Sequence, residues 1–262
     1  MRNRFLGLTL VFALFGFSAV LLAQTAKPSG AATTIPDLSG TWNRSPGRAA
    51  GVFDDDAGGV PFLGFTKQEP PLQPAAMEIY KANRKGVTDS RSKGRDDADP
   101  GNSCFPPGPT RIFTAPLPFE IRQTAEVVYI LSETDHWVRR IYLDGRGHPD
   151  GYPSTWMGHS IGKYDGDTLV VDTADINEAT WIDALGHPHS DALHLVERLR
   201  RVNRDTLEIE VTFDDPKAYT KPWTGKKAYH LQPSASEIKE DMICEQYRKP
   251  GLRNDGFEFI KP

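Results

Sequence analysis

The stretch HLVERLRRVNRDTLEIEVTF, residues 194–213, decides which fold the sequence predicts. Apolar and polar residues alternate along both of its halves, and successive side chains of a strand point to opposite faces. Residues 203–205 between the halves supply a short turn. The stretch therefore predicts an antiparallel hairpin with one buried face. That face consists of Leu195, Leu199, Leu207, Ile209, Val211 and Phe213.

Similar runs recur through residues 116–262 at intervals of about 8–12 residues, separated by the turn signals DGRGHPDG, YDGD, VNRDT and QPSAS. Long helices do not alternate with them, and no GxGxxG phosphate loop occurs, which disfavours a nucleotide-binding α/β fold. We expect a mainly β fold, an antiparallel calycin-like barrel or closed sandwich with one or two short helices and a long irregular N-terminal arm. The runs are FEIRQ, EVVYILSE, HWVRRIYLD, GHSIGKY, DTLVVDT, HLVERLRRV, TLEIEVTFD, KKAYHLQ and EIKEDMICEQ.

The first residues carry a targeting pattern. Residues 1–23 join the positively charged MRNR to a long uncharged apolar run, which is typical of a cleaved signal peptide. A retained membrane anchor is the alternative, because the run is long enough to span a bilayer. Residues 24–36 are expected to form a flexible linker. We expect a periplasmic or secreted protein that meets a membrane only through an uncleaved signal.

The rest of the chain, residues 37–262, is expected to form a single barrel-type domain. Residues 37–115 contain much proline and glycine and little regular pattern, so they predict an irregular arm. One short helix is expected in this arm, with Pro74 in its first turn and its end at Gly86. Residues 116–262 form the strand-rich core.

Charge and cysteine content narrow the possible partners. The chain has 262 residues and a formal net charge of −4, and it lacks the basic stripe of a nucleic-acid binder. We expect a small-molecule ligand or substrate and no nucleic acid. In an oxidising compartment, Cys104 and Cys244 are expected to form a disulfide that closes a loop of about 140 residues, worth roughly 4–5 kcal/mol. Two separate buried thiols are the alternative.

Glu197 lies on the apolar row of its strand, where an unpaired carboxylate is costly to bury. One interpretation is a carboxylate inside the barrel that acts as acid, base or ligand, because burial can bring a carboxyl pKa toward neutrality. The other is a structural ion pair with an arginine such as Arg139 or Arg140. These two arginines are adjacent, so they point to opposite faces and one is expected inside.

Histidine is the side chain whose ordinary pKa lies closest to neutral pH, so it can take and return a proton. We expect acid–base chemistry from His136, His159, His187 and His189 together with Glu197. A pocket for a partly apolar molecule is expected from Arg140, Tyr142, Trp137, Trp156 and Trp181, and Tyr152 is a further candidate for its wall. The alternatives are core packing for the aromatic residues and surface or structural hydrogen bonding for the histidines.

The segment GHPHSDALH, residues 186–194, contains His187, His189 and His194. Three imidazoles with one open position suit a catalytic zinc, copper or iron ion. The glycine and proline of the segment indicate a loop. A divalent metal is therefore the one cofactor that the sequence suggests.

Two other catalytic patterns occur. Residues 158–162, GHSIG, match the GxSxG pattern of serine hydrolases at Ser160, but a strand and a hairpin turn follow where a helix is needed. Asp165, Asp172 and Asp183 are carboxylates of the type that glycosidases pair, but the sequence does not set their separation. We favour neither reaction.

The segment DLSGTWN resembles the Gly-x-Trp opening of lipocalin-type barrels at Gly40, Thr41 and Trp42, where the tryptophan plugs one end of the barrel. The runs PFEIRQ, ETDHWVRRIYLDGRGHP, TWMGHSIGKYDGDTLVVDT, TWIDALGHPHSDALHLVERLRRV and DTLEIEVTFDDPKAYTKPW resemble a group of secreted, mostly uncharacterised soil-bacterial proteins. This second resemblance covers about residues 100–247. It implies a shared fold and an extracytoplasmic location, and it brings no activity with it.

Together these patterns favour an exported enzyme that acts on a small, partly apolar organic molecule by proton transfer between His and Glu. Aromatic molecules belong to this expected substrate class. The reaction is expected to be of lyase, isomerase or hydrolase type. The alternative is a non-catalytic, lipocalin-like protein that binds a small ligand. A second alternative is a histidine-ligated metalloenzyme. An enzyme needs a titratable pair that faces an open site, whereas a binding protein needs an apolar cavity.

Overall fold

The structure is a computed structural model that describes residues 36–44, 60–93, 98–233 and 238–239. All of these residues belong to the unit Ile35–Pro262. Within the described ranges, no helix has the length and apolar character that crossing a membrane requires.

The predicted signal peptide, linker and disulfide involve other residues. The signal peptide, residues 1–23, lies outside the described residues, as does nearly all of the linker, residues 24–36. Cys244 also lies outside them, so its disulfide with Cys104 stays a prediction.

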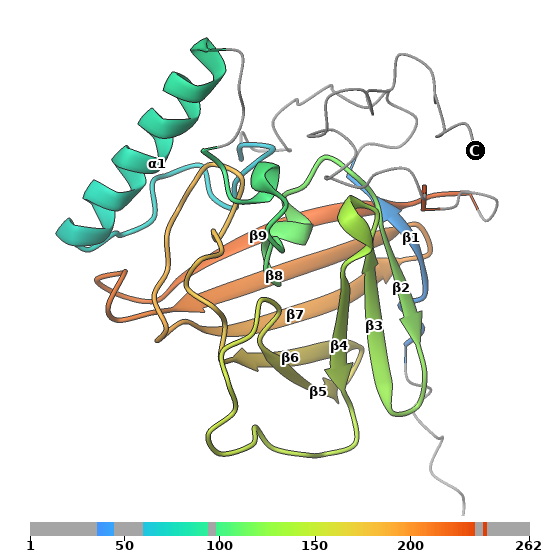
Figure 1. The fold of residues 1–262 in the computed structure, drawn as a ribbon. Helices are drawn as coiled ribbons and strands as arrows, with labels where there is room; N and C mark the ends of the chain where they lie inside the picture. Colours follow the sequence, from blue (N-terminus) through green and yellow to red (C-terminus); the bar gives the residue numbers. More distant parts are fainter. Residues whose placement is uncertain (1–35, 45–59, 94–97, 234–237, 240–262) are drawn as a thin grey trace, which may run out of the picture. The chain divides into compact units, whose positions relative to one another are not determined.

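Nine strands close into one barrel in which each strand pairs with the next along the chain and β9 returns to β1 (Figure 1). The expected mainly β fold is therefore confirmed. The strands are β1 (Gly40–Asn43), β2 (Phe119–Gln123), β3 (Val127–Ser132), β4 (Val138–Tyr142), β5 (His159–Asp165), β6 (Thr168–Ala174), β7 (His194–Asn203), β8 (Thr206–Asp214) and β9 (Trp223–Leu231).

The alternating runs predict eight of these strands, β2 to β9, and Gly40–Asn43 supplies the ninth. The hairpin of residues 194–213 forms as expected, with Leu199 opposite Ile209 across β7 and β8. The last predicted run, EIKEDMICEQ, lies almost entirely outside the described residues, and its two described residues, 238 and 239, carry no strand.

One step of the barrel differs from the antiparallel expectation, because β4 and β5 run parallel. Parallel neighbours require the chain to travel back along the full strand before it pairs again. Residues 143–158 make this return. The turn signal DGRGHPDG lies in this crossover and does not make a hairpin. The parallel pairing is short, with Ile141 opposite Ser160 and Tyr142 opposite Ile161.

In the described part of the arm lies one α-helix, α1 (Pro74–Ser92), which is longer than the predicted helix that ends at Gly86. A glycine inside a helix costs about 1 kcal/mol relative to alanine but keeps its backbone N–H, so it does not force an end. The Lys85–Asp89 ion pair spans this position one helical turn apart. Three short 3₁₀ turns are η1 (Gly101–Ser103), η2 (Arg111–Phe113) and η3 (Thr134–His136).

The arm contributes to the core of the barrel. Phe65 packs edge-on against Phe213 with ring centroids 5.1 Å apart, and Gly225 leaves it room, because a Cβ at that position would overlap Phe65. Phe113 is fully buried, and its carbonyl oxygen accepts a hydrogen bond from the Tyr229 hydroxyl at 2.6 Å. The described arm is therefore packed into the barrel and is not a loose extension.

Trp42 is fully buried and lies opposite Phe119 and Leu231 of the neighbouring strands. Its Nε1 donates to the Leu38 carbonyl oxygen at 3.0 Å. The guanidinium of Arg201 lies 5.2 Å from the centre of the Trp42 ring. The Gly-x-Trp segment thus supplies a buried anchor for β1.

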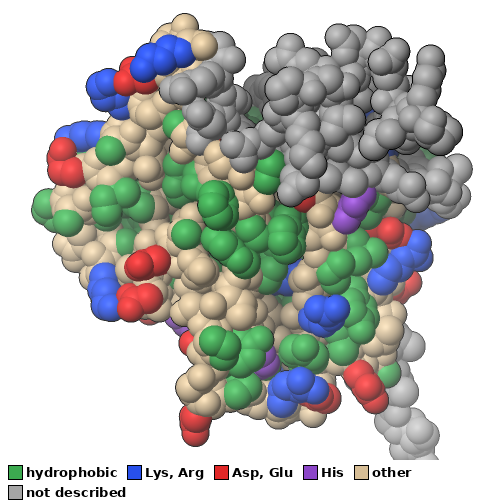
Figure 2. Space-filling view, viewed as in Figure 1, with side chains coloured by type: hydrophobic (Ala, Val, Ile, Leu, Met, Phe, Trp, Pro, Cys, Tyr) green, Lys and Arg blue, Asp and Glu red, His purple; other side chains and the backbone are tan. Residues whose placement is uncertain are grey.

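Apolar side chains also reach the surface. On the face seen in Figure 2 they gather between α1 and the β2–β3 hairpin, with charged side chains around them. Single exposed apolar residues are ordinary on a protein surface and do not by themselves mark a binding face. The exposed large apolar side chains among the described residues include Ile79, Phe105, Val138 and Val202.

Candidate functional site

A polar network lies inside the barrel around Glu197. Arg139 donates from Nη1 to Oε1 of Glu197 at 2.8 Å and from Nη2 to Oε2. The same guanidinium donates to the hydroxyls of Ser160, at 3.1–3.2 Å, and Thr173, at 2.8 Å. The side chains of the ion pair are 1% and 0% exposed. Glu197 therefore forms the second of the two predicted arrangements, a structural ion pair with an arginine inside the barrel.

This network leaves few polar groups inside the barrel that could bind a substrate. Both oxygens of Glu197 are held by Arg139, and the Ser160 hydroxyl of the GHSIG segment bonds to the same arginine. Arg140, predicted as a ligand-binding residue, is the outward neighbour of Arg139 and is exposed. The network joins one residue each from β4, β5, β6 and β7 and is part of the core.

A second group of ionisable side chains lies outside the barrel, on β4 to β7. Alternation along the strands turns these side chains outward, because their neighbours Ser160, Thr173 and Leu195 are buried inside. The crossover of residues 143–158 adds a histidine and a tyrosine over this face. We call the group the outer-face cluster, and its members are Tyr142, His148, Tyr152, His159, Asp172 and His194.

Hydrogen bonds connect the imidazoles of the outer-face cluster in a row. Nδ1 of His148 lies 2.8 Å from Nδ1 of His159. Nε2 of His148 lies 3.1 Å from Oδ1 of Asp172, and Nε2 of His194 lies 2.6 Å from the same oxygen. His159 is 5% exposed, whereas the side chains of Asp172 and His194 are 43% and 42% exposed. The row therefore leads from a buried imidazole to solvent.

Aromatic rings surround His159. The Tyr142 ring stacks on it with centroids 5.6 Å apart, and the Tyr152 ring lies at 5.0 Å. Burial lowers the pKa of His159 below its ordinary value, and the nearby His148 and the Arg146 guanidinium lower the pKa further. His159 is therefore a neutral imidazole at pH 7, with a lone pair available to accept a proton.

Gly158 sets the start of β5 and so the position of His159. Its φ of 65° lies in the left-handed region, where a side chain is strained. A Cβ there would also come within 2.6 Å of the Ala174 carbonyl oxygen. The glycine therefore allows the tight turn that joins the crossover to the strand.

A third group, which we call the His187 clamp, joins the arm and α1 to the loop before β7. It consists of Glu69, Tyr80, Asp183 and His187. Nδ1 of His187 lies 2.7 Å from Oδ2 of Asp183, and Nε2 lies 2.5 Å from Oε1 of Glu69. The Tyr80 ring stacks on the imidazole with centroids 4.3 Å apart and planes 11° apart. An imidazole that bonds two carboxylates is held best as a cation.

Burial and charge oppose each other in the His187 clamp. Burial lowers the pKa of His187, but the carboxylates of Asp183 and Glu69 outweigh it, so the pKa is raised. Burial raises the pKa of Tyr80, and Glu69 adds to this. His187 is therefore a buried cation between two anions, which is a structural arrangement.

The three histidines of GHPHSDALH do not meet at one point. His187 bonds to Asp183 and Glu69, and His194 bonds to Asp172. His189 bonds through Nε2 to the Thr180 hydroxyl at 2.6 Å and donates from Nδ1 to the Ser190 carbonyl oxygen. Over the described ranges, no group of three or more His, Cys, Asp and Glu side chains is arranged to hold a metal ion.

The remaining predicted site residues are spread over the fold. His136 is exposed in η3 and bonds through Nε2 to the Lys239 carbonyl oxygen at 3.1 Å. Trp137 follows it and is half-buried, and Trp156 packs against Phe105 at 5.6 Å. Trp181 is 7% exposed, in the core. Of the predicted set, the structure brings together only Tyr142, Tyr152, His159 and His194.

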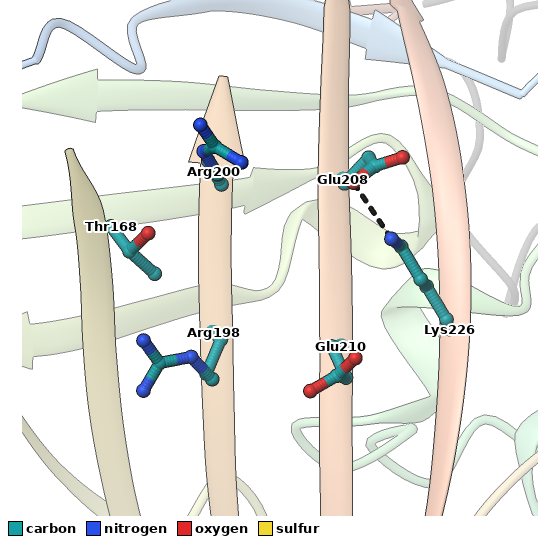
Figure 3. A pocket seen from close by; sticks show the side chains of 6 residues that line it. All are labelled: Thr168, Arg198, Arg200, Glu208, Glu210 and Lys226. Atoms are coloured by element: carbon teal, nitrogen blue, oxygen red, sulfur yellow. Dashed lines mark ion pairs between the residues drawn. The ribbon is translucent and has the colours of Figure 1, made fainter. Parts of the chain in front are cut away.

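A shallow pocket of about 230 Å³ lies on the outer face of β6 to β9 (Figure 3). Its cations have anionic partners: Lys226 pairs with Glu208, and Arg200 pairs with Asp167. Exposed pairs of this kind contribute about 0–1 kcal/mol each and hold the sheet surface together weakly. The pocket is lined by Thr168, Arg198, Arg200, Glu208, Glu210 and Lys226.

Comparison with known proteins identifies no relative: no family model, no curated protein and no solved structure matches the chain. The candidate site therefore stands on the geometry of its own residues.

Sequence reasoning missed two members of the outer-face cluster. His148 lies in DGRGHPDG, which reads as a hairpin turn, so it is expected at a loop tip away from the strands. Asp172 was expected only as one of several carboxylates. A usable signal is the 16-residue length of the segment 143–158, because it exceeds the two to five residues of an ordinary hairpin loop.

The polar network around Glu197 inside the barrel predicts how substitutions there change the free energy of unfolding. Glu197→Leu leaves the buried Arg139 charge unpaired, and we expect it to lower the free energy of unfolding by about 3–5 kcal/mol in urea denaturation. The double variant Arg139→Met/Glu197→Leu should regain most of this, because two apolar residues replace the pair. The exposed control Arg198→Ala should stay within about 0.5 kcal/mol of wild type. If Glu197→Leu were as stable as the wild type, the ion pair would contribute nothing to the free energy of unfolding.

The His187 clamp predicts a pH dependence. Because the native pKa of His187 is raised, its contribution to stability is full below the unfolded pKa of about 6.5 and is lost as the pH rises through the native pKa. His187→Gln should cost roughly 1.5–3 kcal/mol near pH 6 and less near pH 9. Denaturation curves at both pH values test this, with the exposed His136→Gln as control. An equal loss at both pH values contradicts the clamp.

Proposed function

We propose that the protein is an exported enzyme that moves a proton to or from a small, partly apolar organic molecule at the outer-face cluster. The reaction is of lyase, isomerase or hydrolase type. The observation that carries the proposal is the row of hydrogen bonds from His159 through His148 to Asp172, in which a buried neutral imidazole is connected to a half-exposed carboxylate.

In this proposal His159 is the general base. Its Nδ1 is engaged with His148, and no described group bonds to its Nε2. A neutral imidazole takes a proton through its lone pair and returns it in a later step, so one residue serves both halves of an elimination or isomerisation. Its lowered pKa keeps it in the basic form at neutral pH.

The surroundings of His159 support a partly apolar substrate. The rings of Tyr142 and Tyr152 flank the imidazole, and aromatic faces bind flat apolar groups. Asp172 and His194 are partly exposed and add polar contacts at the same place. An aromatic or unsaturated molecule with one acidic C–H or O–H fits this combination.

The lumen offers less support for a lipocalin-like ligand-binding protein. Aromatic residues of the arm and the Arg139–Glu197 pair occupy its interior, and these side chains are buried. A binding function inside the barrel would require them to move. For this reason we propose that the chemistry takes place on the outer face and not in the lumen, where the sequence predicts a role for Glu197.

Export belongs to the proposal as well. It is supported by the charged and apolar pattern of residues 1–23 and by the resemblance of about residues 100–247 to secreted soil-bacterial proteins. The substrate would then be a molecule met outside the cytoplasm.

The test is proton exchange with solvent, because it reports base catalysis whatever the net reaction is. The purified protein is incubated in D₂O with a panel of aryl ketones, β-hydroxy aryl ketones and aryl esters, and deuterium uptake and product formation are followed by mass spectrometry. We expect at least one panel member to react above the buffer rate. His159→Asn should lower that rate by about 10²–10⁴-fold, the usual contribution of a general base.

The matched control is Arg198→Ala, which alters the same outer sheet face away from the imidazoles and should keep the wild-type rate. Circular dichroism checks that each variant is folded. Buffer rates for every panel member, or a folded His159→Asn variant with the wild-type rate, would refute the assignment.

A further inference from the structure

The hydrogen bonds of the outer-face cluster determine where its protons are. A carboxylate oxygen can only accept, so the contacts of Oδ1 of Asp172 with His148 and His194 each require an N–H on Nε2 of the histidine. Neutral His148 therefore carries its proton on Nε2 and a lone pair on Nδ1.

The proton position on His159 follows from this. The 2.8 Å contact between Nδ1 of His148 and Nδ1 of His159 needs one proton between two nitrogens. Because His148 offers a lone pair there, the N–H belongs to His159. Neutral His159 then has its own lone pair on Nε2, the nitrogen that the proposed function uses.

We infer that His148 and Asp172 form a proton relay for His159, so that the positive charge made during the reaction rests on His148 and not on His159. This inference rests on the proposed function. An N–H bond forms at Nε2 of His159 with the substrate proton. The N–H bond at Nδ1 of His159 breaks as one forms at Nδ1 of His148. No ring has to rotate, and no oxidant or reductant is needed.

The surroundings favour this position for the charge. His159 is 5% exposed among aromatic rings and feels the positive charge of Arg146, with Asp175 as an opposing anion. The His148 side chain is 25% exposed and bonds directly to Asp172. A cation is stabilised by solvent and by a hydrogen-bonded carboxylate, so the relay moves the charge from an unfavourable place to a favourable one.

His194 completes the relay as a positioning residue. It donates to the same oxygen of Asp172 at 2.6 Å and holds the carboxylate in place toward His148. Its own side chain is 42% exposed and that of Asp172 is 43% exposed, so water reaches this end of the row. The proton can leave at this end without returning to the substrate.

The first test needs no substrate. Long-range ¹H–¹⁵N NMR distinguishes protonated from unprotonated imidazole nitrogens, and His148→Asn and His159→Asn assign the signals. At neutral pH we expect a proton on Nδ1 of His159 and on Nε2 of His148. As the pH falls, His159 should switch its proton from Nδ1 to Nε2 while His148 becomes doubly protonated. A proton on Nε2 of His159 at neutral pH, or a doubly protonated His159 in the first step, overturns the relay.

The second test uses Asp172→Asn, since an amide cannot stabilise the His148 cation as a carboxylate does. We expect the exchange rate of a reactive panel member to fall by about 10²–10⁴-fold, and the proton of His159 to leave Nδ1 in part of the molecules. Asp165→Asn, a matched change of an exposed aspartate on β5, should leave both readouts unchanged. Wild-type rate and wild-type proton positions in Asp172→Asn also overturn the relay.

The two proposals fail in different ways. If His159→Asn abolishes exchange but the NMR signals place the proton on Nε2 of His159, the base assignment stands and the relay is wrong. If the NMR signals match the relay but no panel member reacts, the hydrogen-bond row is as described and the proposed catalysis is wrong.

Discussion

The Arg139–Glu197 ion pair inside the barrel is the interaction on which the rest of the structure depends. With Ser160 and Thr173 it links β4, β5, β6 and β7 through side chains. The parallel step between β4 and β5 has only two paired positions, so backbone hydrogen bonds hold this seam weakly. Because the network crosses the same seam from inside, it supplies a second connection at one of the two seams where only two positions pair.

The same parallel step also creates the outer-face cluster. A parallel neighbour requires a crossover, and the crossover of residues 143–158 lies against the outer face of β5 and β6. His148 and Tyr152 reach His159 only by this path. The seam therefore has an ion pair on its inner side and the proposed reaction on its outer side, and the stability of the first maintains the geometry of the second.

The two histidine groups show how surroundings set the role of one residue type. His159 is enclosed by aromatic rings and lies near the Arg146 guanidinium, so its pKa falls and it is neutral. His187 is as deeply buried, but two carboxylates bond to it, so its pKa rises. Burial acts in the same direction on both, and the nearest charges decide the outcome. This contrast separates a candidate base from a structural cation.

The sequence by itself determined which face each strand residue takes, because alternation has a fixed period of two. From it follow the hairpin of β7 and β8, the inward position of Glu197, the outward position of His194, and the expectation that one of Arg139 and Arg140 lies inside. The tertiary structure decided what alternation does not encode: which arginine pairs with Glu197, that β4 and β5 run parallel, and that a histidine from a predicted turn lies against β5. The physical reason is the distance along the chain over which each property is set. The face that a strand residue takes depends on neighbours one or two residues away, whereas strand direction and side-chain partners depend on contacts between residues far apart in the chain.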